Sequence, residues 1–353
     1  MSTDLNHTAS AVIATPRKAR RNGMNLASIA ARGSLVMVLI ALVVVFALIN
    51  GSDFFAANTF KLILSTQAAV GVIALAVTIA SVTGQVDLSV ASVMGGAAGI
   101  TAMQVADGSS PVVAMAQALT FALVFGLANG FLVTVGRMSS IIATLATGTI
   151  ATGVGLALVG TNTIAATEPA FLNMFSSTIG GIQTAFFILV AITIVAVVVL
   201  QWTRLGRRLF FVGQNRDAAG LLGIKVRQLT IGGMVAAALL AGFAGIMLTG
   251  QNGGASVTQT SGYLLPVFAA SYLGTSAIVP GRFNAAGTFI ATYVLGTASL
   301  GLNMAGVPQW SSYLFNGGLL IISLGAFEIV NVRKTRVAKR ESIRAAAAAG
   351  AEQ

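Results

Sequence analysis

Long apolar runs recur in this chain from residue 34 to residue 330, and they limit the folds open to it more than any other feature. A helix needs about 20 mostly apolar residues, at a rise of about 1.5 Å per residue, to cross a lipid bilayer. Only 8% of the 353 residues are charged, whereas soluble domains carry about 25%. A surface so poor in charge is unsuited to water, so we predict an integral membrane protein.

Ten segments have the length and composition of membrane spans, and they predict an all-α, polytopic bundle of about ten transmembrane helices. The segment at 262–279 matches the pattern least well, because it contains Pro266 and several small polar residues. The ten predicted spans are 33–50, 62–83, 88–106, 112–134, 139–160, 181–202, 230–250, 262–279, 283–303 and 309–330.

The positions of the basic residues support this number of spans and predict an orientation. If the N-terminus lies in the cytoplasm and the chain crosses ten times, every Lys and Arg except Lys61 falls on the cytoplasmic side. Basic residues that flank spans are retained on that side. We therefore predict a basic cytoplasmic tail at 1–32, a transmembrane domain at 33–330 with a cytoplasmic loop at 203–229, and a cytoplasmic C-terminal tail at 331–353.

The residue inventory excludes several kinds of chemistry. The chain has no cysteine, and its one histidine, His7, lies in the polar N-terminal tail. Disulfides, thiolate zinc sites, Cys-ligated iron–sulfur clusters and a cysteine nucleophile are therefore excluded. Neither a G-x-x-x-x-G-K-[ST] phosphate loop nor a G-x-S-x-G motif occurs, so we predict no enzyme, no metal and no cofactor. The net charge of +11 comes from basic residues that flank the predicted spans. Basic residues in such positions predict membrane topology rather than nucleic-acid binding.

Small residues four positions apart occur within three of the predicted spans. This spacing places both residues on one helix face. Small faces let helix backbones approach closely where lipid provides no hydrophobic drive for association. They therefore predict a bundle packed through small residues, and the pairs are Gly95 with Gly99, Gly126 with Gly130, and Ala241 with Gly245.

Asp87 is the most informative polar residue near the spans, because it lies between two of them in SVTGQVDLSVAS (81–92). A carboxylate at the bilayer centre costs about 2.5–3.5 kcal/mol on insertion scales, so Asp87 should face protein or water. It is equally compatible with a helix cap and with a transport pathway. A cavity lined by uncharged donors and acceptors suits a sugar or polyol better than an ion. Our candidate pathway residues are Gln85, Asp87, Ser89, Asn129, Thr144 and Asn316, and helix-to-helix hydrogen bonding is an alternative for each of them.

The stretch GRRLFFVGQNRDAAGLLGIKV (206–226) concentrates charge between two apolar runs. Six Lys and Arg residues in 204–227 would together cost on the order of 15–20 kcal/mol at the bilayer centre, so this stretch is predicted to be cytoplasmic. Asn215 can cap a short helix whose first turn carries Asp217. The glycines and leucines that follow predict a short surface helix that docks into a groove on another protein.

Three stretches resemble the membrane subunit of bacterial ABC importers for monosaccharides, the ribose/xylose/arabinose permease family. GQVDLSVASVMGGAAG (84–99) is similar to its Gly-Gly-Ile-Asp-Leu-Ser-Val-Gly segment, and NGFLVTVGRMSSIIATLAT (129–147) is similar to its segment with Pro-x-Phe-Ile-x-Thr-Leu. The most specific of the three resembles the family's loop with Thr-x-x-Gly-Arg and Gly-x-Asn-x-x-Ala-Ala-x-x-x-Gly-Ile. In this chain it reads TRLGRRLFFVGQNRDAAGLLGIKV (203–226). The likeness runs from about residue 35 to residue 332. Gln85 and Val86 depart from the pattern, which weakens any transfer of substrate identity.

The resemblance implies that 33–330 is a permease domain that forms the translocation pathway for a monosaccharide or related polyol. It implies three kinds of partner besides the lipid bilayer: cytoplasmic ABC ATPase subunits that hold the ATP and Mg, a periplasmic substrate-binding protein, and a second permease subunit, identical or different. The expected location is the bacterial inner membrane, with both termini in the cytoplasm. The residues implied to couple to the ATPase are Asn215, Arg216, Asp217, Ala218, Ala219, Gly220, Leu221, Gly223 and Ile224.

The alternative is a secondary transporter driven by an ion gradient. Such a protein needs acidic or histidine residues at membrane depth, or broken helices that coordinate sodium. Asp87 is the one candidate for that role in the sequence.

Overall fold

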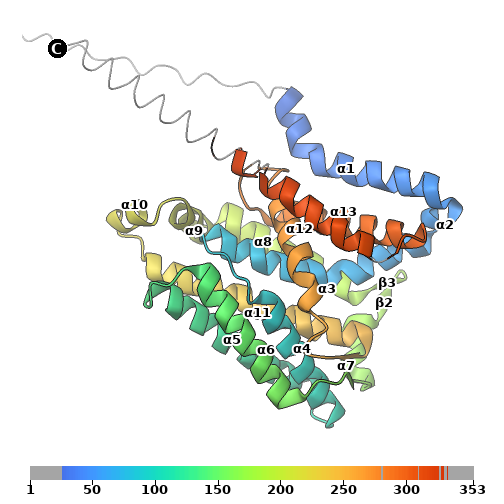
Figure 1. Cartoon of the computed structure of the whole chain (residues 1–353), viewed down its shortest axis with the longest axis horizontal. Coiled ribbons are helices and arrows are strands. Elements are labelled where there is room, and N and C mark those ends of the chain that lie inside the picture. Colours follow the sequence, from blue (N-terminus) through green and yellow to red (C-terminus); the bar gives the residue numbers. More distant parts are fainter. Residues whose placement is uncertain (1–25, 280, 309, 326, 330–331, 333–353) are drawn as a thin grey trace, which may run out of the picture.

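In a computed structural model of the chain, residues 26–279, 281–308, 310–325, 327–329 and 332 are described. Helices make up most of this part of the chain (Figure 1). Eight helices within it are long and apolar enough to cross a membrane. The predicted helical membrane bundle is therefore confirmed, while ten crossings stay a prediction. Most of the tails predicted at 1–32 and 331–353 lies outside the described residues.

The helices follow the predicted spans with shifts of a few residues at their ends. They are α1 (Leu26–Asn50), α2 (Ser52–Phe55), α3 (Ala57–Val82), α4 (Val90–Ala106), α5 (Pro111–Thr134), α6 (Ser140–Val159), α7 (Pro169–Ser176), α8 (Thr184–Val197), a π-helix (Val198–Trp202), α9 (Arg204–Gln214), α10 (Arg216–Leu221), α11 (Val226–Asn252), a 3₁₀ turn (Ser261–Tyr263), α12 (Leu264–Gly274) and α13 (Ala285–Met304). A final span occupies Trp310–Ile329, except for residue 326, which is outside the described residues.

Among the described residues, four two-residue strands form small antiparallel pairs. Strand β1 (Ile164–Ala165) pairs with β4 (Gly254–Ala255), and β2 (Thr178–Ile179) pairs with β3 (Ile182–Gln183) in a hairpin. The first pair joins the segment after α6 to the segment after α11.

Helix α11 lies at the centre of the bundle, where it contacts α3, α4 and α5. Figure 1 shows α5 and α6 along one side, and α1 with α13 along the other. Helices α9 and α10 lie at one end of the bundle, whereas α2, α7 and the β2–β3 hairpin lie toward the opposite end (Figure 1). The two ends therefore present different structures to whatever lies on either side of the membrane.

The predicted small-residue faces all lie at close contacts between elements, which confirms the prediction. A Cβ atom added to Gly126 would lie 2.8 Å from the Cβ of Ala238 on α11. One added to Gly245 would overlap the carbonyl oxygen of Met94 on α4. Because helices this close leave no space even for a methyl group, the bundle core is held by contacts between backbones.

Helix α12 is shorter than predicted. It has 11 residues, or about 16 Å at 1.5 Å per residue, which is too short to cross a bilayer alone. Pro266 lies in its first turn, where proline is tolerated. After the helix, the side chain of Asn284 donates to the carbonyl oxygens of Gly274 at 3.0 Å and Ala277 at 3.3 Å. These bonds replace helical ones, so the predicted helix at 262–279 is wrong in its extent.

The contact of α4 with α11 gives a test of the packing. Gly245→Ala should destabilise the protein, because the new methyl group meets backbone atoms, including Ala98 N at 2.9 Å, that cannot rotate away. Overpacking of this kind costs about 1–3 kcal/mol, so the purified chain should unfold at a lower temperature in detergent. Gly232→Ala on the same helix is the matched control, since nothing lies within 4 Å of its Cβ position. Equal destabilisation by both variants would contradict the packing described here.

Candidate functional site

Residues 83–89 join α3 to α4 without forming a helix. The Leu88 amide donates to Thr144 Oγ1 at 3.0 Å, and the Val86 amide donates to Ser140 Oγ at 3.2 Å. Ser140 begins α6 and Thr144 lies one turn further along it. Non-helical backbone at membrane depth is tolerated only where protein groups satisfy its polar atoms. The hydroxyl groups of α6 do this for segment 83–89.

A buried chain of hydrogen bonds leads from this segment to α5 and α6. Asp87 Oδ1 accepts from the Ser89 amide at 2.9 Å and from Ser89 Oγ at 2.6 Å. Ser89 Oγ accepts from Asn129 Nδ2 at 2.8 Å, and Asn129 Oδ1 accepts from Thr147 Oγ1. None of these four side chains is more than 4% exposed. We call these four residues the Asp87 network.

Asp87 does not occupy the N-cap of α4. Ser89 holds that position, and its side chain makes no capping bond to the helix. Asp87 instead orients Ser89, and its Oδ2 has no hydrogen-bond partner within the described part of the chain. Thr147 completes the network but was not among our candidates, although its three-residue spacing from Thr144 puts both on one face of α6.

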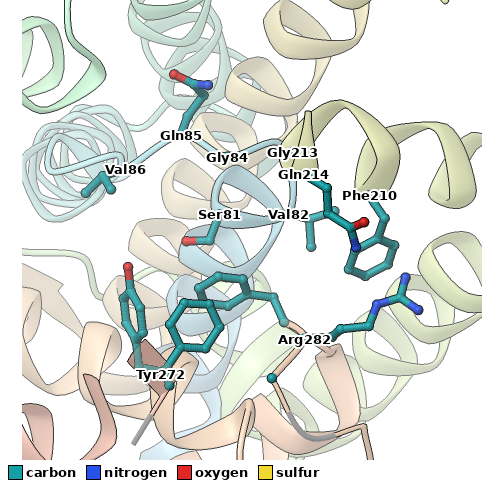
Figure 2. A pocket seen from close by; sticks show the side chains of 13 residues that line it. Ser81, Val82, Gly84, Gln85, Val86, Phe210, Gly213, Gln214, Tyr272 and Arg282 are labelled. Carbon is teal, nitrogen blue, oxygen red and sulfur yellow. The ribbon is translucent and has the colours of Figure 1, made fainter. Parts of the chain in front are cut away.

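A cavity of about 610 Å³ lies beside segment 83–89, between α3, α9 and α12, and we call it the α9 cavity (Figure 2). The rings of Tyr272, Phe283 and Phe327 form a cluster in its wall, with centroids 5.1 to 5.6 Å apart. The Arg282 guanidinium carbon lies 4.1 Å from the centre of the Phe210 ring, toward which it points in Figure 2. The other lining residues are Ser81, Val82, Gly84, Gln85, Val86, Gly213, Gln214 and Gly281.

A second cavity, of about 510 Å³, lies between α3, α12, α13 and the final span, and we call it the α13 cavity. Carboxamides and hydroxyls line it together with apolar groups, and none of the lining residues that the structure describes is charged. Asn316 Oδ1 and Ser312 Oγ are buried in its wall without a hydrogen-bond partner among the described residues. The lining carboxamides are those of Gln67, Gln259, Asn303 and Asn316.

Residues of α3 and α12 line both cavities, and three hydroxyls meet between them. Thr78 Oγ1 hydrogen-bonds to Ser271 Oγ at 2.9 Å and to Thr288 Oγ1 at 2.7 Å, which joins the three helices. All three side chains are fully buried. Along α3, Gln67 of the α13 cavity precedes Thr78, and Ser81 of the α9 cavity follows it. This hydroxyl layer therefore lies between the two cavities along α3.

The predicted candidate residues thus fall into three places. Asp87, Ser89 and Asn129 meet in the Asp87 network, and Thr144 supports the adjoining backbone. Gln85 lines the α9 cavity and Asn316 lines the α13 cavity. The residues of the Asp87 network line neither of these two cavities and hydrogen-bond to one another.

Helix α9 contacts segment 83–89 through two glycines. A Cβ on Gly213 would overlap the carbonyl oxygen of Val82, and a Cβ on Gly84 would lie 3.0 Å from the carbonyl oxygen of Gly213. Gly84 also has a φ of +75°, which glycine adopts at no steric cost. Because no side chain lies between the two backbones, α9 is in direct backbone contact with a wall of the α9 cavity.

Helix α10 begins as the sequence predicts. Asn215 is its N-cap, and Asn215 Oδ1 accepts from the Ala218 amide at 2.9 Å. Arg216 donates to Thr230 Oγ1 on α11 at 3.2 Å, which ties α10 to the bundle. The predicted cap is confirmed, whereas the predicted contact with an ATPase stays a prediction.

Two apolar side chains are exposed where α10 ends. Leu221 is 90% exposed and Leu222 is 71% exposed, whereas Ala219 is fully buried. Exposed apolar groups gathered beside polar ones mark surfaces that bind other proteins. Among the other predicted coupling residues, Asn215, Arg216, Asp217, Gly220 and Gly223 are exposed, and Ala218 and Ile224 are half-buried.

Residues 58–324 match the protein family described as branched-chain amino acid transport system / permease component. The chain belongs to this permease family. It is 32% identical over 289 residues to the ribose import permease protein of Bacillus subtilis (strain 168), a match that covers 81% of this permease and 89% of that relative. The L-arabinose ABC transporter permease protein of Azospirillum brasilense is 26% identical over 293 residues, with 83% of this permease and 86% of the relative covered.

The fructose import permease protein of Rhizobium meliloti is 29% identical over 301 residues, covering 82% of this permease and 83% of that protein. The resemblance noted in the sequence to sugar importer permeases is thus confirmed. A solved structure of a metal-chelate type ABC transporter in an inward-facing conformation is similar to this permease, with a TM-score of 0.42 and 17% sequence identity. The match covers 86% of this permease and 98% of that chain. That likeness is too distant to place individual residues.

Two substitutions of Asp87 distinguish the contribution of its hydrogen bonds to stability from the contribution of its negative charge. Asp87→Ala should destabilise it by about 1–3 kcal/mol, because two buried donors of Ser89 lose their acceptor. Asp87→Asn keeps an acceptor oxygen in the Oδ1 position, so it should lower the unfolding temperature much less. The measurement is thermal unfolding of the purified permease in detergent. Equal losses in the two variants would show that the negative charge, not the hydrogen bonds, matters.

Proposed function

We propose that this permease forms the translocation pathway of an ABC importer for a monosaccharide or a related polyol. Separate ATPase subunits, which hold the ATP and Mg, bind at α10, a periplasmic binding protein delivers the substrate, and a second permease subunit completes the assembly. The observation that carries the proposal is the glycine contact between α9 and segment 83–89, which joins the partner-facing helices to a cavity wall. ATP-driven movement of the partner then has a direct route to the pathway.

The α13 cavity supports a sugar over an amino acid as the substrate. An amino acid carries an ammonium and a carboxylate, and burying either group without a partner of opposite charge is costly. Within the described part of the chain, no charged side chain lines this cavity. A sugar instead offers several hydroxyls, which pair with carboxamides and with the unpartnered Asn316 Oδ1 and Ser312 Oγ. Relatives named as ribose, L-arabinose and fructose permeases favour the same class.

The hydroxyl layer at Thr78, Ser271 and Thr288 supports an alternating mechanism. It joins α3, α12 and α13 at a level between the α13 cavity and the α9 cavity. We therefore place the barrier to substrate at this layer, with the α13 cavity open to one side of the membrane and the α9 cavity open to the other. Movement of α9 and segment 83–89 against α12 shifts the balance between two such states.

Charge supports an orientation with α9 and α10 in the cytoplasm. Six basic residues lie in 204–227, and Arg282 stacks on Phe210 of α9 at the same end. Lys61 is at the opposite end, where its side chain packs beside Gly181 of the hairpin. Since basic residues are retained in the cytoplasm, α7 and the β2–β3 hairpin face the periplasm in the bacterial inner membrane. That end is where the binding protein docks.

The docking surface on α10 can be tested with exposed residues. Leu221→Asp should reduce ATP-dependent uptake at least about tenfold, because a buried charge in the partner's groove costs more than 1.4 kcal/mol. Uptake of labelled D-ribose, L-arabinose and D-fructose is measured in vesicles that contain the permease, its ATPase and the binding protein. Asp53→Lys, an exposed change on α2 at the opposite end, is the control for expression and insertion.

Wild-type uptake by Leu221→Asp would remove α10 as the coupling element. Collapse of wild-type uptake by an uncoupler, with ATP intact, would instead favour a transporter driven by an ion gradient.

The sugar pathway has its own test in the α13 cavity. Asn316→Leu should lower uptake several-fold and leave copurification of the ATPase unchanged, because it removes an acceptor from the cavity and does not alter α10. Leu314→Ala, on the same span but 68% exposed, is the control that should transport normally. Unchanged uptake by Asn316→Leu would exclude this residue from the pathway.

A further inference from the structure

A second surface of α9 carries charge that the proposed coupling does not use. A groove of about 440 Å³ lies between α9 and the turn that follows α10, and we call it the arginine groove. Guanidinium groups and apolar side chains line it together, and none of the described residues in its lining carries a carboxylate. The lining residues are Arg204, Arg207, Arg208, Phe211, Leu222 and Ile224.

The three arginines of the groove have free hydrogen-bonding capacity. All are exposed, and within the described part of the chain the one side-chain hydrogen bond among them runs from Arg207 to the Trp202 carbonyl at 3.4 Å. Like charges this close repel one another in the absence of an anion. Three guanidinium groups beside an apolar wall therefore form a surface suited to an anionic ligand.

The position of α9 places this site at the membrane surface. Arg204 follows Trp202 by two residues, and Trp202 ends the span at Thr184–Trp202 with 73% of its surface exposed. Tryptophan is enriched at the interface between lipid and water. Helix α9 also buries Leu209 and Val212 while its arginines face outward, the pattern of a helix that lies in the headgroup region.

We propose that the arginine groove binds the phosphate headgroup of an anionic phospholipid. Arginine forks donate paired hydrogen bonds to phosphate oxygens, and Phe211, Leu222 and Ile224 contact the apolar part of the lipid beyond the phosphate. An acidic surface on a partner protein is the rival ligand. The lipid is favoured because the arginines begin in the first turn after a span, whereas the most exposed apolar residue, Leu221, lies further along the chain on α10.

The bound lipid holds α9 at the membrane surface. Since α9 contacts segment 83–89 through Gly213, the lipid composition of the membrane sets the resting position of the cavity wall. This consequence rests on the proposed function, whereas lipid binding itself does not.

The two tryptophans of the chain make a direct test possible. Trp310→Phe leaves Trp202 as the sole fluorescent tryptophan, two residues from the groove. The full-length permease is reconstituted in mixed vesicles, and quenching of Trp202 is compared between brominated phosphatidylglycerol and brominated phosphatidylcholine at equal mole fraction. Several-fold stronger quenching by phosphatidylglycerol is expected. The preference should fall with added salt, because the Debye length drops from about 10 Å at 0.1 M to about 3 Å at 1 M.

The variant Arg204→Gln/Arg207→Gln/Arg208→Gln should abolish this preference, and Arg227→Gln, an exposed arginine outside the groove, should retain it. Adding inorganic phosphate should not displace the lipid. Equal quenching by the two lipids in the protein with intact arginines would overturn the proposal, and loss of copurified ATPase from the triple variant in that case would assign the arginines to the partner protein.

Mass spectrometry of copurified lipid gives a second readout that does not need Trp310→Phe. The protein with intact arginines should retain more phosphatidylglycerol than the triple variant does. Equal amounts in the two proteins would overturn the proposal.

Discussion

The backbone of segment 83–89 sets the constraint on which the rest of this structure depends. Its first three amides still donate to carbonyl oxygens at the end of α3. The amides of Val86, Leu88 and Ser89 donate to side-chain oxygens instead, and lipid offers no partner for them. The protein meets this requirement with hydroxyls on α6 at Ser140 and Thr144, and with the Asp87 network that reaches α5. Once the segment is held in this way, α4 begins only at Val90, and the space left beside the segment becomes the α9 cavity.

Glycine contacts place segment 83–89 directly against α9, so that movement of one can be transmitted to the other. A side chain between α9 and the segment would rotate and absorb movement, but Gly84 and Gly213 bring the two backbones into direct contact. The same principle packs α11 against α4 and α5. The hydroxyl layer on α12 differs, because three hydrogen bonding groups can separate and bond again with little change in energy. The structure thus combines a rigid contact at α9 with a separable one at α12.

The sequence predicted the elements whose signals are local. Apolar length predicted the spans, four-residue spacing predicted the small faces, and Asn215 predicted the start of α10. The sequence did not predict hydrogen bonds between residues that are far apart in the chain. Asn129 meets Ser89 across 40 residues, and no local pattern indicates that pairing. It also overestimated α12, because the apolar residues after Gly274 resemble helix until Asn284 binds their carbonyls.

Distances between spin labels test most directly whether α9 and segment 83–89 move as one body. The chain has no cysteine, so labels at Val86→Cys with Gln214→Cys, and at Val86→Cys with Leu265→Cys, report on single pairs. In the complete complex, the distance from 86 to 214 should stay constant between the ATP-free and vanadate-trapped states, while the distance from 86 to 265 on α12 changes. A change from 86 to 214 as large as that from 86 to 265 would contradict the account.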